Sequence, residues 1–348
     1  LLQKLLADDG VIFISIDDTE CSNLILICNE IFGASNFVAN VSWQRTYSPR
    51  NDSKGIVSEV EHLVVFSKNP GWQPNKLPRT EAMDSRYKNP DNDVAPWKSS
   101  DAFAPGAATH QGMVYAIQHP FTGEMLYPSN GRCWRYQQSS MLEYMQGWCN
   151  YRLENLHDEK ERARVCGIDE SAVRKDVLAI VLEEPLEVSA AKAQKVYNRG
   201  RWPGFYFTKG GYGGIARKTY LENVGGRLPT NLWMYEETGH TDEAKKELIS
   251  LFGGRSPFDT PKPTRLLDFV LKVAGTSETL MLDSFAGSGT TAHAVLNANK
   301  ADNGNRHFIL IEMMDYADSI TAERVKRVIK GYGEGKNAVE GTGGNFSF

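Results

Sequence analysis

A stretch near the end of the chain, MLDSFAGSGTT at residues 281–291, has the residue types of a loop that holds a polar or anionic ligand. A run of apolar residues ends at Asp283, and Gly287 and Gly289 come directly before a run that favours a helix. Glycine lets the backbone pass close beneath a ligand, and the first turn of a helix directs free N–H groups and the positive end of its dipole at that ligand. The stretch therefore predicts a strand, a ligand-binding loop and a helix in succession.

A second acidic residue fits the same site. Glu312 closes the next apolar run along the chain, and a carboxylate at this place accepts hydrogen bonds from both hydroxyls of a ribose in dinucleotide-binding folds. The loop also fits the G-x-G-x-x-A pattern of nicotinamide dinucleotide sites, with Ala292 as its last residue, and it lacks the Gly-Lys-Ser/Thr of a P-loop. A nicotinamide dinucleotide, another nucleoside cofactor, and a tight turn without any ligand all remain open at this point.

The composition describes a globular chain without an overall bias toward nucleic acid. The chain has 348 residues, 41% of them hydrophobic, and a formal net charge of −4. Two domains, or one domain with a long insertion, are expected, and nucleic-acid binding requires a local basic face. No apolar run is long enough to cross a membrane. The five cysteines are scattered without a CxxC, which favours reduced thiols and a cytoplasmic protein, and His110 and His119 have no cysteine pair nearby, so no metal site is predicted.

Alternating strands and helices at both ends of the chain position these residues. Such alternation is typical of an α/β fold with a doubly wound sheet. Between about 70 and 240 the sequence is richer in turns and predicts a separate module, with a helix from Met141 to about Glu184. The predicted strands are residues 11–16, 36–45, 62–68, 279–285 and 307–313, and the predicted helices are 19–32, 242–252, 264–274, 290–300 and 316–332.

Asp283, Phe285, Gly287 and Gly289 are similar in type and spacing to the S-adenosylmethionine loop of DNA amino-methyltransferases, D-P-F-x-G-S-G-T-T, with Ser284 in place of the usual proline. Four stretches resemble the modification subunits of type III restriction–modification systems: LLADDGVIFISIDD, FDTPKP, LDSFAGSGTTAHAVL and NRHFILIE. Those subunits are adenine-N6 DNA methyltransferases. The resemblance implies an α/β, Rossmann-like methyltransferase sheet that is doubly wound and circularly permuted. It places a remainder of the catalytic half at 1–70, an inserted α+β target-recognition module at 71–240, the cofactor half at 241–335 and a loose tail at 336–348.

The resemblance also implies which residues bind S-adenosyl-L-methionine. Phe285 would flank the adenine or the methionine portion, and Gly287 and Gly289 would lie beneath the cofactor. Glu312 would hold the ribose, and the TPKP stretch at 260–263 matches a motif that helps to bind the methionine end. The cofactor-binding residues expected on these grounds are Asp283, Phe285, Gly287, Ser288, Gly289, Thr290, Glu312, Thr260 and Lys262.

The family's catalytic motif, Asp-Pro-Pro-Tyr or a close variant, has no counterpart in this sequence. Its acid and a backbone carbonyl accept hydrogen bonds from the target amine, and its aromatic residue stacks on the flipped base. The chain contains no Pro-Pro pair; NPGW at 69–72 has glycine as its second proline, and DVAPW at 93–97 has the wrong spacing. The motif is therefore expected upstream of Leu1 in an intact protein, and this chain alone is expected to bind the cofactor weakly and to transfer no methyl group.

Residues 187–227 combine eight lysines and arginines with two glutamates and several aromatic residues. Basic side chains neutralise phosphates, and aromatic side chains stack on bases or fill the gap left by a flipped base. A solvated surface with an aromatic core of its own is the alternative. The DNA-binding candidates are Arg217 and Lys218, which match basic positions of the family, together with Arg132, Trp134 and Arg135 of GRCWR.

The leading prediction is a site-specific DNA methyltransferase that uses S-adenosylmethionine and flips adenine out of duplex DNA. Cytosine-N4 methylation is the nearest alternative. The alternatives from other classes are a non-catalytic DNA-recognition module with a vestigial cofactor loop and an NAD-dependent oxidoreductase. Duplex DNA is the expected partner and no membrane is expected, while a homodimer and a restriction subunit with nuclease and translocase activity are implied by the resemblance alone.

Overall fold

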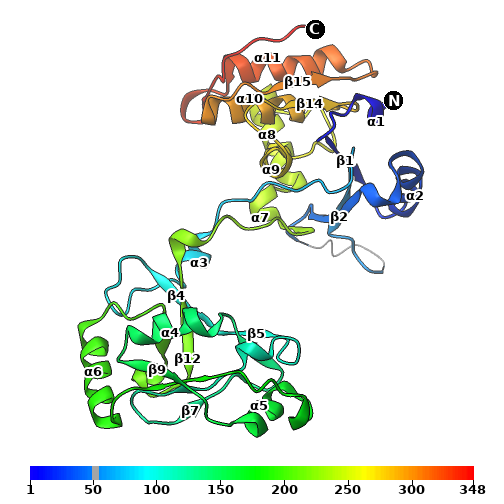
Figure 1. The fold of residues 1–348 in the computed structure, drawn as a ribbon. Helices are drawn as coiled ribbons and strands as arrows, with labels where there is room; N and C mark the ends of the chain where they lie inside the picture. The colour runs from blue at the N-terminus through cyan, green and yellow to red at the C-terminus, as the bar shows by residue number, and fades with distance from the viewer. Residues whose placement is uncertain (49–54) are drawn as a thin grey trace. The chain divides into compact units, whose positions relative to one another are not determined.

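The computed structural model describes residues 1–48 and 55–348, and the chain divides into two compact units (Figure 1). Unit 1 comprises Leu1–Pro78 and Gly226–Phe348, and unit 2 is Arg79–Gly225. The residues of unit 2 therefore interrupt those of unit 1 along the chain. Each unit has its own hydrophobic core.

The first part of unit 1 is a mixed four-stranded sheet with two helices. Its elements are α1 (Leu2–Leu5), β1 (Val11–Ile16), α2 (Cys21–Phe32), β2 (Phe37–Gln44), β3 (Val60–Ser67) and β13 (Leu232–Trp233). The strand order is β1-β3-β2-β13. β3 runs antiparallel to both β1 and β2, and β13 pairs parallel with β2. Helix α2 covers β3 through Cys28 and Phe32, which pack against Val64 and Phe66.

The second part of unit 1 is a strand–helix–strand unit with further helices. Its elements are α7 (Tyr235–Thr238), α8 (Thr241–Phe252), α9 (Thr264–Ala274), β14 (Leu280–Asp283), α10 (Thr290–Asp302), β15 (His307–Leu310), the π-helical turn η6 (Ala317–Ala322), α11 (Glu323–Lys330), β16 (Gly331–Tyr332) and β17 (Val339–Glu340). β14 and β15 are parallel, with Leu280 opposite His307 and Asp283 opposite Leu310. Because parallel neighbours require a crossover, α10 is the connection between them.

Helix α9 holds the two parts of unit 1 together because it is apolar on more than one side. Phe269 packs in one cluster with Trp43 and Trp233 of the four-stranded sheet, and the rings of Trp233 and Phe269 are 4.7 Å apart. Leu271 packs in another cluster with Val295 of α10. Burial of each such side chain stabilises the fold by about 1.5–3 kcal/mol, so α9 fixes β14 and its loop relative to the sheet.

The fold is mixed α/β, as predicted, but its strands form separate sheets. In the part of the chain that the structure describes, β14 and β15 form a two-stranded parallel sheet, and the four-stranded sheet is mainly antiparallel. The β14–α10–β15 crossover is the unit from which doubly wound sheets are built. Circular permutation and the role of unit 2 as an inserted recognition module stay predictions.

Unit 2 consists of short strands and helices around an aromatic core. Its elements are α3 (Glu81–Asp84), β4 (Trp97–Asp101), β5 (Phe103–Pro105), β6 (Ile117–Gln118), β7 (Met125–Leu126), β8 (Arg132–Trp134), α4 (Gln138–Gln146), β9 (Tyr151–Glu154), α5 (Glu159–Cys166), β10 (Ala179–Leu182), α6 (Leu186–Arg199), β11 (Phe205–Phe207) and β12 (Ile215–Tyr220). Its sheets have the orders β7-β6-β10-β9, β11-β12-β4 and β5-β8. Tyr115, Trp134, Trp148, Phe205 and Phe207 are buried in one cluster.

The predicted helix from Met141 to about Glu184 is wrong. The region contains α4, β9, α5 and β10 instead. α4 ends at Gly147, where a Cβ would lie 2.8 Å from the ring of Pro203, and α5 ends at Gly167 in the left-handed conformation. β9 and β10 then pair antiparallel with each other. Tertiary pairing therefore outweighs the helix propensity of this Glu- and Arg-rich segment.

The predicted module boundaries at 71 and 240 both lie inside unit 1. Leu77 is buried and pairs with Arg227 in an isolated β-bridge, and β13 and α7 also belong to unit 1. The stretch predicted to be a loose tail contains β17, which pairs with β16, and Phe346 packs against the core beside α10 and α11.

Two predictions concern the chain as a whole. All five cysteines are free and buried, as expected for reduced thiols. Among the described residues, no helix has both the length and the apolar character that a membrane span requires.

Candidate functional site

The glycine loop joins β14 to α10 and needs glycine at two positions. Gly287 and Gly289 have φ values of 53° and 79°, in the left-handed region that residues with a Cβ avoid. A Cβ at residue 289 would also lie 3.0 Å from the carbonyl oxygen of Thr321. The loop therefore lies directly against η6, and the predicted succession of strand, loop and helix is confirmed.

Asp283 holds the two ends of the loop together. One carboxylate oxygen accepts a hydrogen bond from the N–H of Phe285 at 3.1 Å, and the other accepts one from the hydroxyl of Thr291 at 2.6 Å. Thr291 belongs to the first turn of α10. The aspartate therefore fixes the path of the loop from the strand into the helix.

Glu312 lies beside the loop, just beyond the end of β15. Its carboxylate accepts hydrogen bonds from the N–H groups of Gly287 at 2.8 Å, Met313 at 2.9 Å and Met314 at 3.1 Å. Partial burial acts to raise the pKa of Glu312, but these donors and the hydroxyl of Tyr316 outweigh it and lower the pKa below its ordinary value. The structure thus brings an ionised carboxylate, as the sequence spacing predicts, to the glycine loop.

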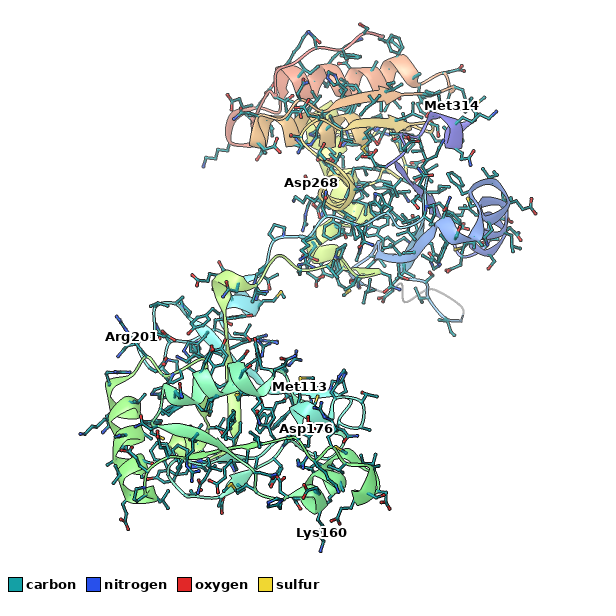
Figure 2. The ribbon with its side chains drawn as sticks, viewed as in Figure 1. Met113, Lys160, Asp176, Arg201, Asp268 and Met314 are labelled. Carbon is teal, nitrogen blue, oxygen red and sulfur yellow. The ribbon has the colours of Figure 1, made fainter. Side chains whose placement is uncertain are left out.

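Exposed apolar side chains surround the loop and Glu312. Phe285 is 84% exposed, Met313 88% and Met314 54%, and Met314 is labelled in Figure 2. Large apolar side chains gathered on a surface mark a site for another molecule. Sequence patterns alone do not single out Met313 and Met314, because two methionines after a strand look like a continuation of that strand.

Ser288 and Thr290, both expected to bind the cofactor, direct their side chains into the protein. Both residues are almost fully buried, and their hydroxyl oxygens lie 3.2 Å apart. The guanidinium of Arg324 donates to both hydroxyls, at 3.1 Å and 2.9 Å. The Thr290 hydroxyl also lies 3.1 Å from the carbonyl oxygen of Lys262, to which it donates. These two side chains therefore hold the loop in place from beneath.

The TPKP stretch lies next to the loop, as the contact between Thr290 and Lys262 shows. Thr260 is exposed and Lys262 is partly buried. The ammonium of Lys262 forms an ion pair with Glu61 of β3 and lies 5.2 Å from the ring centre of Trp43. Lys262 shares the carboxylate of Glu61 with Arg45, whose guanidinium lies 3.1 Å from the other oxygen.

The DNA-binding candidates separate into exposed and buried residues of unit 2. Arg135 is exposed, and Arg132 and Arg217 are half-buried. Arg132 forms an ion pair with Asp101 at 2.6 Å. Arg217 lies opposite Ser100 in the β12–β4 pair, and within the described residues it has no ion pair. These three arginines are the candidates that reach the surface of unit 2.

Lys218 and Trp134 belong to the interior of unit 2. The ammonium of Lys218 forms ion pairs with Asp91, at 2.5 Å, and with Asp93, and its side chain has no exposed area. The indole N–H of Trp134 donates to the carbonyl oxygen of Tyr115 at 2.8 Å, and the side chain is buried. In this conformation neither side chain is available to a phosphate or a base.

The aromatic residues of 187–227 also serve mainly as core. Phe205, Tyr206 and Phe207 form β11 and are buried, whereas Tyr212 is 63% exposed. The aromatic character of this segment therefore reflects packing within unit 2, as the alternative interpretation of the sequence expects.

The two partial matches to a Pro-Pro motif occupy structural positions. Residues 69–71 form a turn directly after β3, and Trp72 packs against the core of unit 1. In the second match Asp93 is a partner of Lys218, and Trp97 is buried in β4. The catalytic residues remain unassigned.

A βαβ crossover with a glycine loop, and an acidic residue after the second strand, is the arrangement found in the dinucleotide-binding class of α/β folds. A family model described as DNA methylase matches residues 1–323, and the chain belongs to this N6/N4 DNA methylase family.

The chain is similar to modification subunits and methyltransferases of known bacterial and phage systems. It is 30% identical over 345 residues to the type III restriction-modification enzyme StyLTI Mod subunit of Salmonella typhimurium, covering 94% of this chain and 43% of that protein. It is 27% identical over 333 residues to the EcoPI Mod subunit of Escherichia phage P1, covering 90% and 43%. It is 27% identical over 316 residues to the type II methyltransferase M.KpnI of Klebsiella pneumoniae, covering 89% and 63%. The chain thus spans less than two thirds of each of these relatives.

Proposed function

We propose that unit 1 carries the S-adenosylmethionine site of a site-specific, adenine-N6 DNA methyltransferase of the circularly permuted type. The observation that carries this proposal is the convergence of the glycine loop and Glu312, whose carboxylate lies 2.8 Å from the N–H of Gly287. A Cβ at residue 289 would lie 3.0 Å from the carbonyl oxygen of Thr321, a tight contact, and Phe285 and Met313 are exposed beside the loop. These features match a nucleoside cofactor. Its flat base suits the exposed Phe285, its ribose suits Glu312, and its close approach to the backbone suits the glycine loop.

Each residue of the site then has a physical role. Phe285 would contact the adenine ring of the cofactor, and Glu312, which stays ionised because its pKa is lowered, would accept hydrogen bonds from the ribose hydroxyls. Asp283 keeps the loop in shape, and Lys262 of the TPKP stretch would help to bind the methionine end. When bound, the cofactor supplies an electrophilic methyl group on its sulfonium. No residue of this chain is assigned to act on the target amine, because the sequence contains no Pro-Pro pair.

Unit 2 is the target-recognition module in this proposal. Arg132, Arg135 and Arg217 reach its surface and neutralise phosphates of duplex DNA, from which the target adenine is flipped. The relatives named Mod subunits belong to restriction-modification enzymes, so a second copy of the chain and a restriction subunit are proposed as partners in the cytoplasm. Cytosine-N4 methylation is the alternative, because the family includes both amine chemistries.

The cofactor proposal is tested by thermal unfolding of this chain with S-adenosylmethionine, S-adenosylhomocysteine or NAD. A ligand that binds only the folded state raises the melting temperature by mass action. We expect a shift with the two S-adenosyl compounds and none with NAD. The Phe285→Ala variant should lose most of the shift without a change in its own melting temperature, since Phe285 is exposed. A shift with NAD alone, or no shift at all, would contradict the proposal.

The DNA proposal is tested by charge reversal of the exposed Arg135 and the half-buried Arg217 in the same chain. Arg135→Glu with Arg217→Glu should weaken duplex DNA binding and reduce its dependence on salt concentration. The matched control is Lys160→Glu with Lys175→Glu, which makes the same change in net charge at two exposed residues of unit 2 (Lys160 is labelled in Figure 2). Equal binding by both double variants would contradict the assignment of Arg135 and Arg217 to DNA binding.

A further inference from the structure

The buried guanidinium of Arg324 lies beneath the glycine loop and contacts four elements of unit 1. Its side chain has no exposed area. It donates to the hydroxyls of Ser288 and Thr290 on one side, at 3.1 Å and 2.9 Å. On the other side it donates to Glu247 of α8 at 2.8 Å and to Thr264 of α9 at 3.1 Å.

The partners of Arg324 leave little of its hydrogen-bonding capacity unused. Nδ1 of His293 lies 3.1 Å and 3.3 Å from two of the guanidinium nitrogens, and it accepts from them as a neutral ring. Within the described residues, Glu247 is the carboxylate paired with the guanidinium. A planar guanidinium with several donors in a fixed fork can reach both sides at once, and a lysine ammonium cannot.

Thr321, one turn before Arg324, contacts the same loop. Its hydroxyl donates to the carbonyl oxygen of Gly287 at 2.6 Å, and its own carbonyl oxygen is the atom that a Cβ at residue 289 would meet at 3.0 Å. η6 is a π-helical turn, a feature often found at functional sites. Thr321 and Arg324 together therefore contact or closely approach residues 287–290.

We propose that Arg324 is a positioning residue that, with Thr321, fixes the glycine loop in the conformation that binds the methyl donor. This inference rests on the proposed function of unit 1. Glu247 acts as the counter-ion that keeps the guanidinium charged and oriented in the interior. Arg324 does not touch the ligand; it acts through the hydroxyls of Ser288 and Thr290.

The test compares two conservative variants of one helix. Arg324→Lys keeps a positive charge near Glu247 but loses the fork. The matched control is Arg327→Lys, since Arg327 also lies on α11 and bonds to Glu323 at 2.7 Å and to the carbonyl oxygen of Leu251 at 3.0 Å, away from the loop. The dissociation constant of S-adenosylhomocysteine is measured by calorimetry at a temperature at which all variants are folded.

We expect Arg324→Lys to weaken S-adenosylhomocysteine binding by about tenfold or more, the scale of losing hydrogen bonds to a charged donor. Amide hydrogen exchange at residues 287–290 of the ligand-free variant should also become faster. Arg327→Lys should bind like the unchanged chain. If Arg324→Lys does not fold, Thr321→Val carries the test, because it removes the hydroxyl that holds Gly287 while nearly preserving shape.

Unchanged binding by a folded Arg324→Lys or Thr321→Val variant, or equal weakening by Arg327→Lys, would overturn the positioning role and leave the proposed function standing. If the unchanged chain binds neither S-adenosylmethionine nor S-adenosylhomocysteine, the proposed function fails, and the role of Arg324 fails with it.

Discussion

Lys218 in unit 2 and Arg324 in unit 1 are both basic side chains with no exposed area, but their partners differ. Lys218 faces two carboxylates, Asp91 and Asp93, and donates to the carbonyl oxygen of Trp202. Arg324 faces one carboxylate, that of Glu247, and donates to hydroxyls on the glycine loop.

The partners of the two side chains indicate different roles. Lys218 serves as a structural cation, whereas Arg324 contacts the glycine loop. In the cluster around Lys218, burial acts to raise the pKa of Asp93, but hydrogen bonds from the ammonium and from the hydroxyl of Tyr220 outweigh it and lower that pKa. Asp93 therefore stays ionised, and the partners of Lys218 all lie within unit 2. The cluster around Arg324 instead extends to Ser288 and Thr290, so a change in it reaches the loop. The residue type alone does not distinguish the two cases.

The largest expected effect is on unit 2. Lys218→Met should lower the free energy of unfolding by about 3–5 kcal/mol, because it leaves Asp91 and Asp93 buried without their cation. Urea unfolding followed by tryptophan fluorescence measures the change, and exposed Lys160→Met is the control, with an expected change within about 0.5 kcal/mol. Adding Asp91→Asn and Asp93→Asn to Lys218→Met should recover part of the loss. A loss no larger than that of the control would show that Lys218 is not a structural cation.

A smaller effect is expected from pH at the Arg324 cluster. Burial, and then the positive charge of Arg324, lower the pKa of His293 from 6.5 to about 3. The unfolded chain therefore takes up a proton below about pH 6.5 that the folded chain does not. The stability that the neutral ring provides is fully present above that pH and falls by about 1.4 kcal/mol for each pH unit down to about pH 3.

His293→Gln removes this titration from unit 1. Between pH 7.5 and about pH 5, the free energy of unfolding should fall in both proteins. The fall should be about 2 kcal/mol smaller in the variant than in the unchanged chain. Urea unfolding at the two pH values measures both losses, and the carboxylates contribute equally to the two proteins. Equal losses would mean that His293 is not held neutral beside Arg324.

The smallest effect is a difference between two glycines in the left-handed conformation. Gly289 has φ 79° and ψ 26° and lies against Thr321, whereas Gly167 of unit 2 has φ 69° and ψ 35° and no atom within 4 Å of its Cβ position. Both changes to alanine should destabilise the chain by about 1–2 kcal/mol through the left-handed backbone. Gly289→Ala should destabilise it by about 1 kcal/mol more, on the scale of overpacking a filled site. Equal losses in urea unfolding would show that the loop can move away from Thr321.

Short-range features of the fold could be predicted from the sequence. The βαβ unit around the glycine loop and the helix at 264–274 follow from apolar periodicity and from residues close together in the chain. The place of Glu312 beside the loop follows as well, because parallel strands bring their carboxyl ends to the same edge.

Long-range contacts could not be predicted in the same way. Arg324 meets Glu247 and Thr264 across large separations in sequence, and nothing near Arg324 indicates its burial. Lys218 looks like a surface residue in a basic segment, although Asp91, far away in sequence, neutralises it. The segment at 141–184 has helical composition, but strand pairing between β9 and β10 decides its structure.

Amide hydrogen exchange of this chain, with and without S-adenosylhomocysteine, tests most directly whether the glycine loop and Glu312 form the methyl-donor site. We predict slower exchange in residues 284–291 and 311–316 when the ligand is present, and no change there with NAD. Protection confined to unit 2, or ligand binding without protection of these two segments, would contradict the assignment of the glycine loop and Glu312 to the methyl donor.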